Sequence, residues 1–154
     1  MSYRSLTFVW AVLLALSFGQ VAIAGEDLRA GDVVRSGLTR TQAQQVLTVA
    51  LREAGFDLAK PGISIDGELV DQHGEPPHPG YFDFSVGYDA PDAGATEYLG
   101  LFAVSRLTGD VWEINRCRRF ASPELRRLQA SIAKRTRKSF RDERAARKGL
   151  GCTE

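Results

Sequence analysis

We expect this 154-residue chain to form a single α+β domain, with an N-terminal helix, an antiparallel meander of three or four strands and a basic C-terminal helix. Three observations predict this class. Apolar residues at helical spacing run through residues 39–54, alternating apolar segments extend from residue 63 to residue 114, and a second helix start follows at Ser122. Helices at both ends of an antiparallel sheet can bury one face of each element in a common core.

Residues 1–24 have the three-part layout of a cleavable signal peptide. Arg4 lies in the basic start, residues 6–18 form the apolar stretch, and Ala22 and Ala24 provide the small side chains of a cleavage site. The apolar stretch is shorter than the roughly 20 residues of a membrane-spanning helix, and no later segment is long enough. We therefore expect cleavage after Ala24 and a periplasmic or secreted protein. An uncleaved N-terminal anchor is the alternative.

The domain is expected to cover residues 38–154, after a polar, aperiodic stretch over residues 25–37 that is typical of a flexible arm. Thr39 and Gln42 fit a capping box, in which the side chain of each accepts a hydrogen bond from the backbone N–H of the other. Gly55 supplies the left-handed residue that ends a helix. The apolar residues at helical spacing between them are Ala43, Val46, Leu47, Ala50, Leu51 and Ala54.

The sheet is predicted from alternation with a period of two residues. Residues 63–70 alternate partly and predict a short or edge strand. Residues 73–80 contain three prolines, which remove backbone donors, so this segment is expected to be a loop. Residues 81–88 alternate clearly, residues 97–105 are apolar on both faces and predict a central strand, and residues 111–114 return after a tight turn.

The C-terminal helix begins with Ser122 as its N-cap and Pro123 at its first position. Its narrow apolar seam is formed by Leu125, Leu128 and Ile132, and Phe140 is a further candidate for it. Beyond residue 139 the segment is helical by propensity but has little to bury, so we expect a solvated, basic end.

Cys117 and Cys152 are the two cysteines of the chain, and both follow the expected cleavage site. Oxidising conditions favour a disulfide in an exported protein. We predict that they pair and tie the end of the last strand to the C-terminal tail, which stabilises by about 3–4 kcal/mol on the chain-entropy model. A catalytic thiol is the weaker alternative, because neither cysteine lies in a nucleophile motif.

The formal charge of +1 conceals an uneven distribution. Residues 25–115 contain 15 acidic and 6 basic residues, whereas residues 116–154 contain 4 acidic and 13 basic residues. The basic segment is expected to be solvated or to pair with the acidic part of the same molecule. The alternative is that one charged face binds an oppositely charged partner. For the basic segment that partner would be an anionic cell-wall polymer or lipid, since export argues against nucleic acid.

No catalytic motif stands out: the sequence contains no phosphate-binding loop, metalloprotease motif or serine elbow. His73 and His78 lie among acidic residues, but two histidines on a loop lack the fixed geometry of a helical pair, so we expect no metal and no other cofactor. A carboxylate pair suited to glycoside hydrolysis is a further alternative, yet nothing singles out two of the acids. We expect a binding protein and not an enzyme.

The hairpin over residues 101–112, with Thr108-Gly109-Asp110-Val111 at its turn, resembles the hairpin of PepSY-like domains and of small periplasmic immunity-type proteins. A capped helix precedes the meander in those families too. The resemblance implies an exported protein without catalytic residues that acts by binding. We therefore expect an immunity protein that neutralises a secreted antibacterial hydrolase in the cell envelope, with a protein partner and no nucleic-acid partner. A non-catalytic envelope accessory protein is the alternative.

The expected contact surface combines acids with aromatic anchors, because charge mostly sets the encounter rate whereas buried aromatics carry affinity. The candidate residues are Asp71, Glu75 and Tyr81 at the loop, and Asp110 and Trp112 at the end of the hairpin. The alternatives are that Tyr81 covers the sheet edge and that Trp112 lies in the core.

Overall fold

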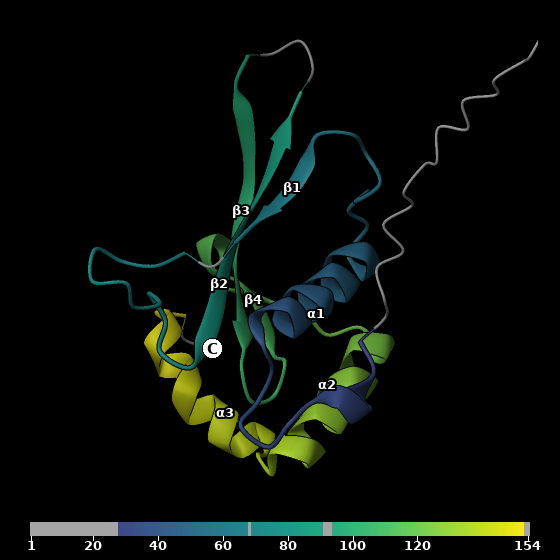
Figure 1. Ribbon diagram of the computed structural model, residues 1–154, viewed down its shortest axis with the longest axis vertical. Coiled ribbons are helices and arrows are strands. Elements are labelled where there is room, and N and C mark those ends of the chain that lie inside the picture. The colour runs from purple at the N-terminus through teal and green to yellow at the C-terminus, as the bar shows by residue number, and fades with distance from the viewer. Residues whose placement is uncertain (1–27, 68, 91–93, 153–154) are drawn as a thin grey trace, which may run out of the picture.

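The computed structural model describes residues 28–67, 69–90 and 94–152, so the expected signal peptide and its cleavage site lie outside the described residues. Its centre is a five-stranded antiparallel sheet in the order β1-β2-β3-β4-β5, in which each strand pairs with its neighbour along the chain. Helices lie on both faces of this sheet (Figure 1). The predicted α+β class is confirmed.

The strands are β1 (Ile63–Asp66), β2 (Tyr81–Asp89), β3 (Thr96–Ser105), β4 (Val111–Glu113) and β5 (Arg118–Arg119). The α-helices are α1 (Arg40–Glu53), α2 (Pro123–Thr136) and α3 (Phe140–Ala146), and the 3-10 helices are η1 (Ala30–Asp32), η2 (Ile114–Arg116) and η3 (Arg147–Leu150). The short β5 is the strand that the sequence did not predict.

The main core lies between one face of the sheet and the helices α1 and α2. Thr39 and Gln42 form the predicted capping box of α1, and the Ser122 hydroxyl accepts from the Leu125 backbone N–H at the start of α2. The side chains that meet in this core are buried, among them Val46, Leu47, Phe84, Phe102, Val104, Leu125 and Ile132. Local capping motifs therefore place both helices as the sequence predicted.

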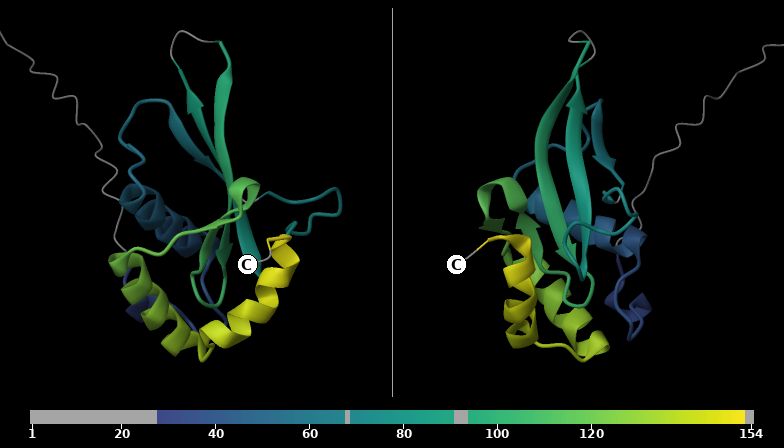
Figure 2. Two further views of the ribbon diagram at one scale, coloured as in Figure 1. Left: turned by 180° about the vertical axis from the view of Figure 1, so that it is seen from behind. Right: turned by 90° about the vertical axis from the view of Figure 1, so that its left-hand side faces the viewer.

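The C-terminal segment is not one continuous helix. α2 ends at Thr136 because Arg137 adopts left-handed backbone angles (φ 59°, ψ 33°). Ser139 then starts α3, and its side chain and that of Asp142 form a second capping box. This break turns the chain, so that α3 and η3 pack on the face of the sheet opposite α1 (Figure 2).

A second, smaller core lies under α3 and η3. It contains Tyr81, Ala103, Trp112, Leu150 and Cys152. Cys152 is bonded to Cys117, 35 residues away in sequence, with 5.2 Å between their Cα atoms. The predicted disulfide is confirmed. The β2–β3 hairpin extends beyond both helical layers (Figure 1).

The end of the expected flexible arm packs against the domain in this structure. Residues 30–32 form η1, and Val33 is 2% exposed and belongs to the main core. Within the described part of the chain, no helix has the length and apolar character needed to cross a membrane.

Candidate functional site

A buried polar network joins α3 to the sheet. The Glu143 carboxylate, only 4% exposed, accepts hydrogen bonds from the Tyr81 hydroxyl, from Ser105 Oγ at 2.8 Å and from Thr108 Oγ1 at 2.5 Å. Burial, followed by the hydrogen bond to Glu143, raises the pKa of Tyr81 well above its ordinary value. The phenol therefore stays protonated and remains a donor to the carboxylate.

Asp110 forms the second part of the network and is fully buried. Its Oδ2 accepts from Trp112 Nε1 at 2.9 Å and from Arg147, whose Nε and Nη2 lie at 3.0 and 2.9 Å. Its Oδ1 accepts from Arg119 Nε at 2.7 Å. A buried carboxylate needs such charged partners to offset its lost hydration. Because Arg147 begins η3, these bonds hold the C-terminal segment on the sheet.

Three of the five predicted contact residues are therefore interior. Tyr81, Asp110 and Trp112 are exposed by 3%, 0% and 2%, respectively. Their side chains are engaged in the network under α3 and do not face outward in this structure. Trp112 lies in the core, which was the alternative to a surface position.

The other two predicted residues, Asp71 and Glu75, are exposed on the loop between β1 and β2. Asp71 Oδ1 accepts from the backbone N–H of His73 at 2.8 Å and of Glu75 at 3.0 Å, so it organises the tip of this loop. His78 holds the end of the loop, since its Nδ1 lies 2.6 Å from Oδ1 of the fully buried Asp83. Desolvation raises the pKa of Asp83, and the hydrogen bonds from His78 oppose that rise.

On one face of the sheet, α3 and η3 cover one end, and no helix covers the strands β2 and β3 beyond them (Figure 2). Strand pairing places Asp66 beside Ser85, Ser85 beside Leu101, and Gly87 beside Tyr98. We call these positions the open face. Tyr98 is 57% exposed, and its cross-strand neighbour Gly87 has no side chain to cover it. A rigid strand therefore presents an exposed aromatic ring.

Hydrogen bonds and charges define the surroundings of Tyr98. The side-chain oxygen of Asn115 accepts from the Tyr98 hydroxyl at 3.3 Å and from the Leu101 backbone N–H at 2.9 Å. Exposed acids on β1, on the loop and on the β2–β3 hairpin make no ion pair with another described residue: Asp66, Asp71, Glu75, Asp89 and Glu97. Of these, strand pairing places Asp66 and Asp89 on the same face of the sheet as Tyr98. This arrangement suits a cationic protein surface.

Sequence reasoning missed Tyr98 because its exposure depends on register. A β-bulge between Val86 and Gly87 shifts the pairing, so that Gly87 faces Tyr98 across the ladder. The one local indication was the polar start of the third strand at Glu97, which is too weak to show which face stays uncovered.

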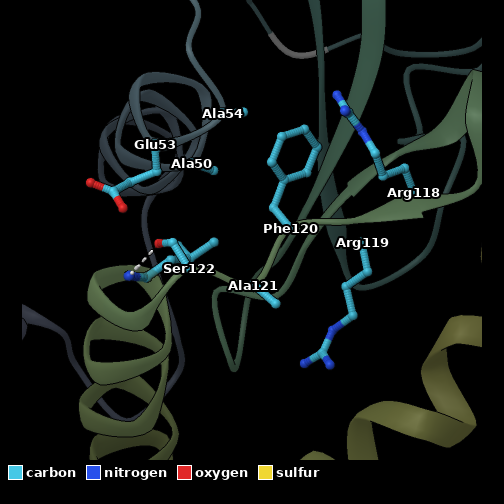
Figure 3. A pocket seen from close by; sticks show the side chains of 9 residues that line it. Ala50, Glu53, Ala54, Arg118, Arg119, Phe120, Ala121 and Ser122 are labelled. Carbon is cyan, nitrogen blue, oxygen red and sulfur yellow. Dashed lines mark hydrogen bonds between the residues drawn. The ribbon is translucent and has the colours of Figure 1, made fainter.

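A shallow pocket of about 290 Å³ lies on the other side of the molecule, between α1, β5 and the start of α2 (Figure 3). Phe120 and Leu125 supply apolar lining, and Glu53 and Arg118 lie on opposite sides of the Phe120 ring. Arg118 is already engaged, since its Nε and Nη2 lie 2.9 and 2.8 Å from Oε2 of the buried Glu113. The Ser122 hydroxyl in the lining is also engaged, because it accepts the hydrogen bond from the Leu125 backbone N–H that caps α2.

The part of the chain that the structure describes contains no preformed metal site. No group of three or more histidine, cysteine, aspartate and glutamate side chains is gathered there. His78 is instead bonded to Asp83.

Comparison with known proteins identifies the family. Residues 37–144 match the family model described as the type VI secretion system immunity protein Tgi2PP, and the chain belongs to this family. It is 56% identical to a chain in a solved type VI secretion system effector–immunity complex from Pseudomonas protegens. That match covers 82% of this chain and 99% of the other, with a TM-score of 0.78. The comparison with curated proteins gave no match.

The family result confirms the expected class, an immunity protein, and corrects the PepSY-like resemblance, which was wrong. The physical reason lies in the hairpin sequence that suggested it. Gly109 has φ 67°, as a tight turn requires, and Thr108 and Asp110 bond to Glu143 and Arg147. A turn of this composition arises in unrelated folds.

Proposed function

We propose that this immunity protein is exported and neutralises a secreted effector by direct, non-catalytic binding in the periplasm. The family assignment supports an immunity role, and the related solved structure is of an effector–immunity complex. An immunity protein must be present where its effector acts. The signal-peptide pattern of residues 1–24 therefore favours an effector that acts outside the cytoplasm, and we infer a hydrolase that attacks the envelope.

The open face and the β1–β2 loop form the proposed contact surface. The observation that carries this assignment is Tyr98, an exposed aromatic side chain on a strand that is hydrogen-bonded within the sheet, with the exposed acids Asp66 and Asp89 on the same face. A rigid aromatic side chain loses little conformational entropy on binding, and unpaired acids attract a cationic partner. Tyr81, Asp110 and Trp112 contribute indirectly, by holding the C-terminal segment on the sheet.

The first test measures association with the toxin encoded by the neighbouring gene. Replacing Glu75 with lysine should slow association several-fold and weaken its salt dependence, because rim charges act mainly on the encounter rate. Asp71 is left intact in this variant because its carboxylate organises the loop. Glu53→Lys, which reverses an exposed acid on α1, is the matched control and should leave the association rate nearly unchanged.

The second test measures dissociation. Tyr98→Ala should speed dissociation by roughly 30-fold, since loss of an interface anchor costs about 2 kcal/mol or more. Val34→Ala is the control, because Val34 has the same 57% exposure but precedes α1 instead of lying on the open face. Unchanged kinetics for Glu75→Lys and Tyr98→Ala, together with loss of binding on charge reversal at Arg126 and Arg127, would place the effector on the basic helices instead.

A further inference from the structure

The strongest charged feature outside the proposed effector surface runs from the last turn of α2 through α3 into η3. Between residues 134 and 148 the exposed side chains include one acid, Asp142, whose carboxylate is engaged in capping Ser139. The exposed cations of this segment, apart from Arg135, form what we call the basic pole: Lys134, Arg137, Lys138, Arg141, Arg144 and Lys148. Arg135 donates to the Gly31 carbonyl oxygen.

These cations are not neutralised by the acidic part of the domain. None of the six forms an ion pair with another described residue, whereas arginines 116, 118, 119 and 147 each pair with the buried Glu113 or Asp110. Figure 1 shows why: the α2–α3 junction is at one end of the long axis, and the β2–β3 hairpin with Asp89 and Glu97 extends to the other. The division of charge along the sequence thus becomes a dipole along the molecule.

The composition of the basic pole restricts its partner. Among the side chains that the structure describes, the large exposed hydrophobic ones are Val34, Val70 and Tyr98, and none of these belongs to the basic pole. Because the six side chains that define the pole are cations, a membrane contact made through them is electrostatic and peripheral.

The shape of the basic pole favours a flat anionic surface over a linear polyanion as its binding partner. α2 and α3 meet at an angle, so their junction projects from the end of the molecule (Figure 1). A linear polyanion is typically held in a charged groove, whereas a projecting corner can rest on a flat surface. A cluster of four to eight lysines and arginines is also the usual composition of a segment that binds anionic lipid headgroups.

We propose that the basic pole docks this immunity protein peripherally on the anionic lipid surface of the membrane that bounds its compartment. In this orientation the long axis stands away from the membrane, and the β2–β3 hairpin points into the surrounding space. The membrane would thus concentrate the protein without occupying the open face. Each cation near such a surface contributes about 1 kcal/mol, or roughly a fivefold change in partitioning, and the contribution is screened by salt.

The test is sedimentation of the mature protein with vesicles made of equal parts phosphatidylglycerol and phosphatidylethanolamine, compared with phosphatidylcholine vesicles. Binding should be confined to the anionic vesicles and should weaken as salt is raised. The triple variant Lys134→Gln, Lys138→Gln and Arg141→Gln should reduce the partition coefficient by roughly 100-fold. All three side chains are exposed and unpaired, so the fold should be retained.

The charge-matched control removes three exposed cations outside α2 and α3 that form no ion pair with a described residue, with the changes Arg40→Gln, Arg52→Gln and Lys60→Gln. It should bind anionic vesicles nearly as the unsubstituted protein does. Three outcomes would overturn the proposal: no binding to anionic vesicles, an equal loss in both triple variants, or salt-sensitive binding to purified peptidoglycan sacculi alone. Effector neutralisation measured in solution should be unchanged in the basic-pole variant, so this test and that of the effector surface fail independently.

Discussion

Replacing Arg147 with alanine should destabilise the fold far more than replacing Arg144, its neighbour on the same segment. The Arg147 side chain is 9% exposed and donates two hydrogen bonds to Asp110 Oδ2, and its guanidinium lies 5.4 Å from the centre of the Trp112 ring. Arg144 is exposed and makes no ion pair with a described residue. The two substitutions remove the same side chain, so their difference isolates the buried contacts.

The magnitude follows from the partners of Asp110. Breaking a buried ion pair by removing one member costs about 3–5 kcal/mol, because the other charge is left buried. Arg119 and Trp112 stay bonded to Asp110 in the variant, so we expect the lower end of this range, about 3 kcal/mol. A surface change such as Arg144→Ala is expected to stay within about 0.5 kcal/mol. The difference is a large fraction of the roughly 5–15 kcal/mol that stabilises a typical domain.

The assay is urea unfolding of the oxidised protein after removal of residues 1–24. Trp10 lies in that leader, so Trp112 is the sole tryptophan that remains, and its fluorescence reports on the network itself. The double variant Asp110→Asn with Arg147→Met should be less destabilised than Arg147→Met alone, which measures the coupling of the pair. If Arg147→Ala and Arg144→Ala unfold within about 0.5 kcal/mol of each other, the buried pair does not hold the C-terminal segment as argued.

The remaining predictions concern three other contacts. Replacing Cys117 and Cys152 with serine should lower the free energy of unfolding by about 3–4 kcal/mol in urea titrations, because the loop is no longer closed in the unfolded chain; an unchanged unfolding midpoint would contradict this. His78→Ala should cost about 1–3 kcal/mol in the same assay, since the buried Asp83 loses a hydrogen-bond donor, and a cost near zero would show that water replaces the imidazole. Hydrogen bonds from Ser139 lower the pKa of Asp142 in the folded protein. The Asp142 carboxylate therefore stabilises the fold above the pKa of the unfolded chain, and this contribution is lost as the pH falls through the folded pKa. Asp142→Asn should remove that part of the acid sensitivity.

Features encoded by neighbouring residues were predictable from the sequence. The capping box of Thr39 with Gln42 requires contacts only three residues apart. The start of α2 is equally local, because Ser122 caps a backbone N–H three residues later and Pro123 occupies the first helical position. The strands followed from alternation, which reports directly on which side chains are buried. The disulfide followed from export and from the presence of two cysteines, not from their positions in space.

The candidate site was less predictable because it depends on contacts between distant segments. Glu143 and Arg147 are indistinguishable in sequence from the exposed charges around them, and Ser105, Thr108 and Asp110 lie more than 30 residues earlier. The same distance explains why the sequence did not show that Tyr81 and Trp112 are buried, since the C-terminal segment covers both. The exposure of the Tyr98 side chain depends on a β-bulge and on a glycine in the adjacent strand.

The amino-acid sequence by itself thus determined the expected class, the helix starts, the strands and the separation of acidic from basic residues, because each follows from local chemistry or composition. Only the tertiary structure decided which charges are buried and which remain free. The left-handed Arg137 sends α3 to the second face of the sheet, where Glu143 and Arg147 meet hydroxyl and carboxylate partners. The exposed cations of the same segment form no ion pair with a described residue, and the exposed acids Asp66 and Asp89 share the open face with Tyr98.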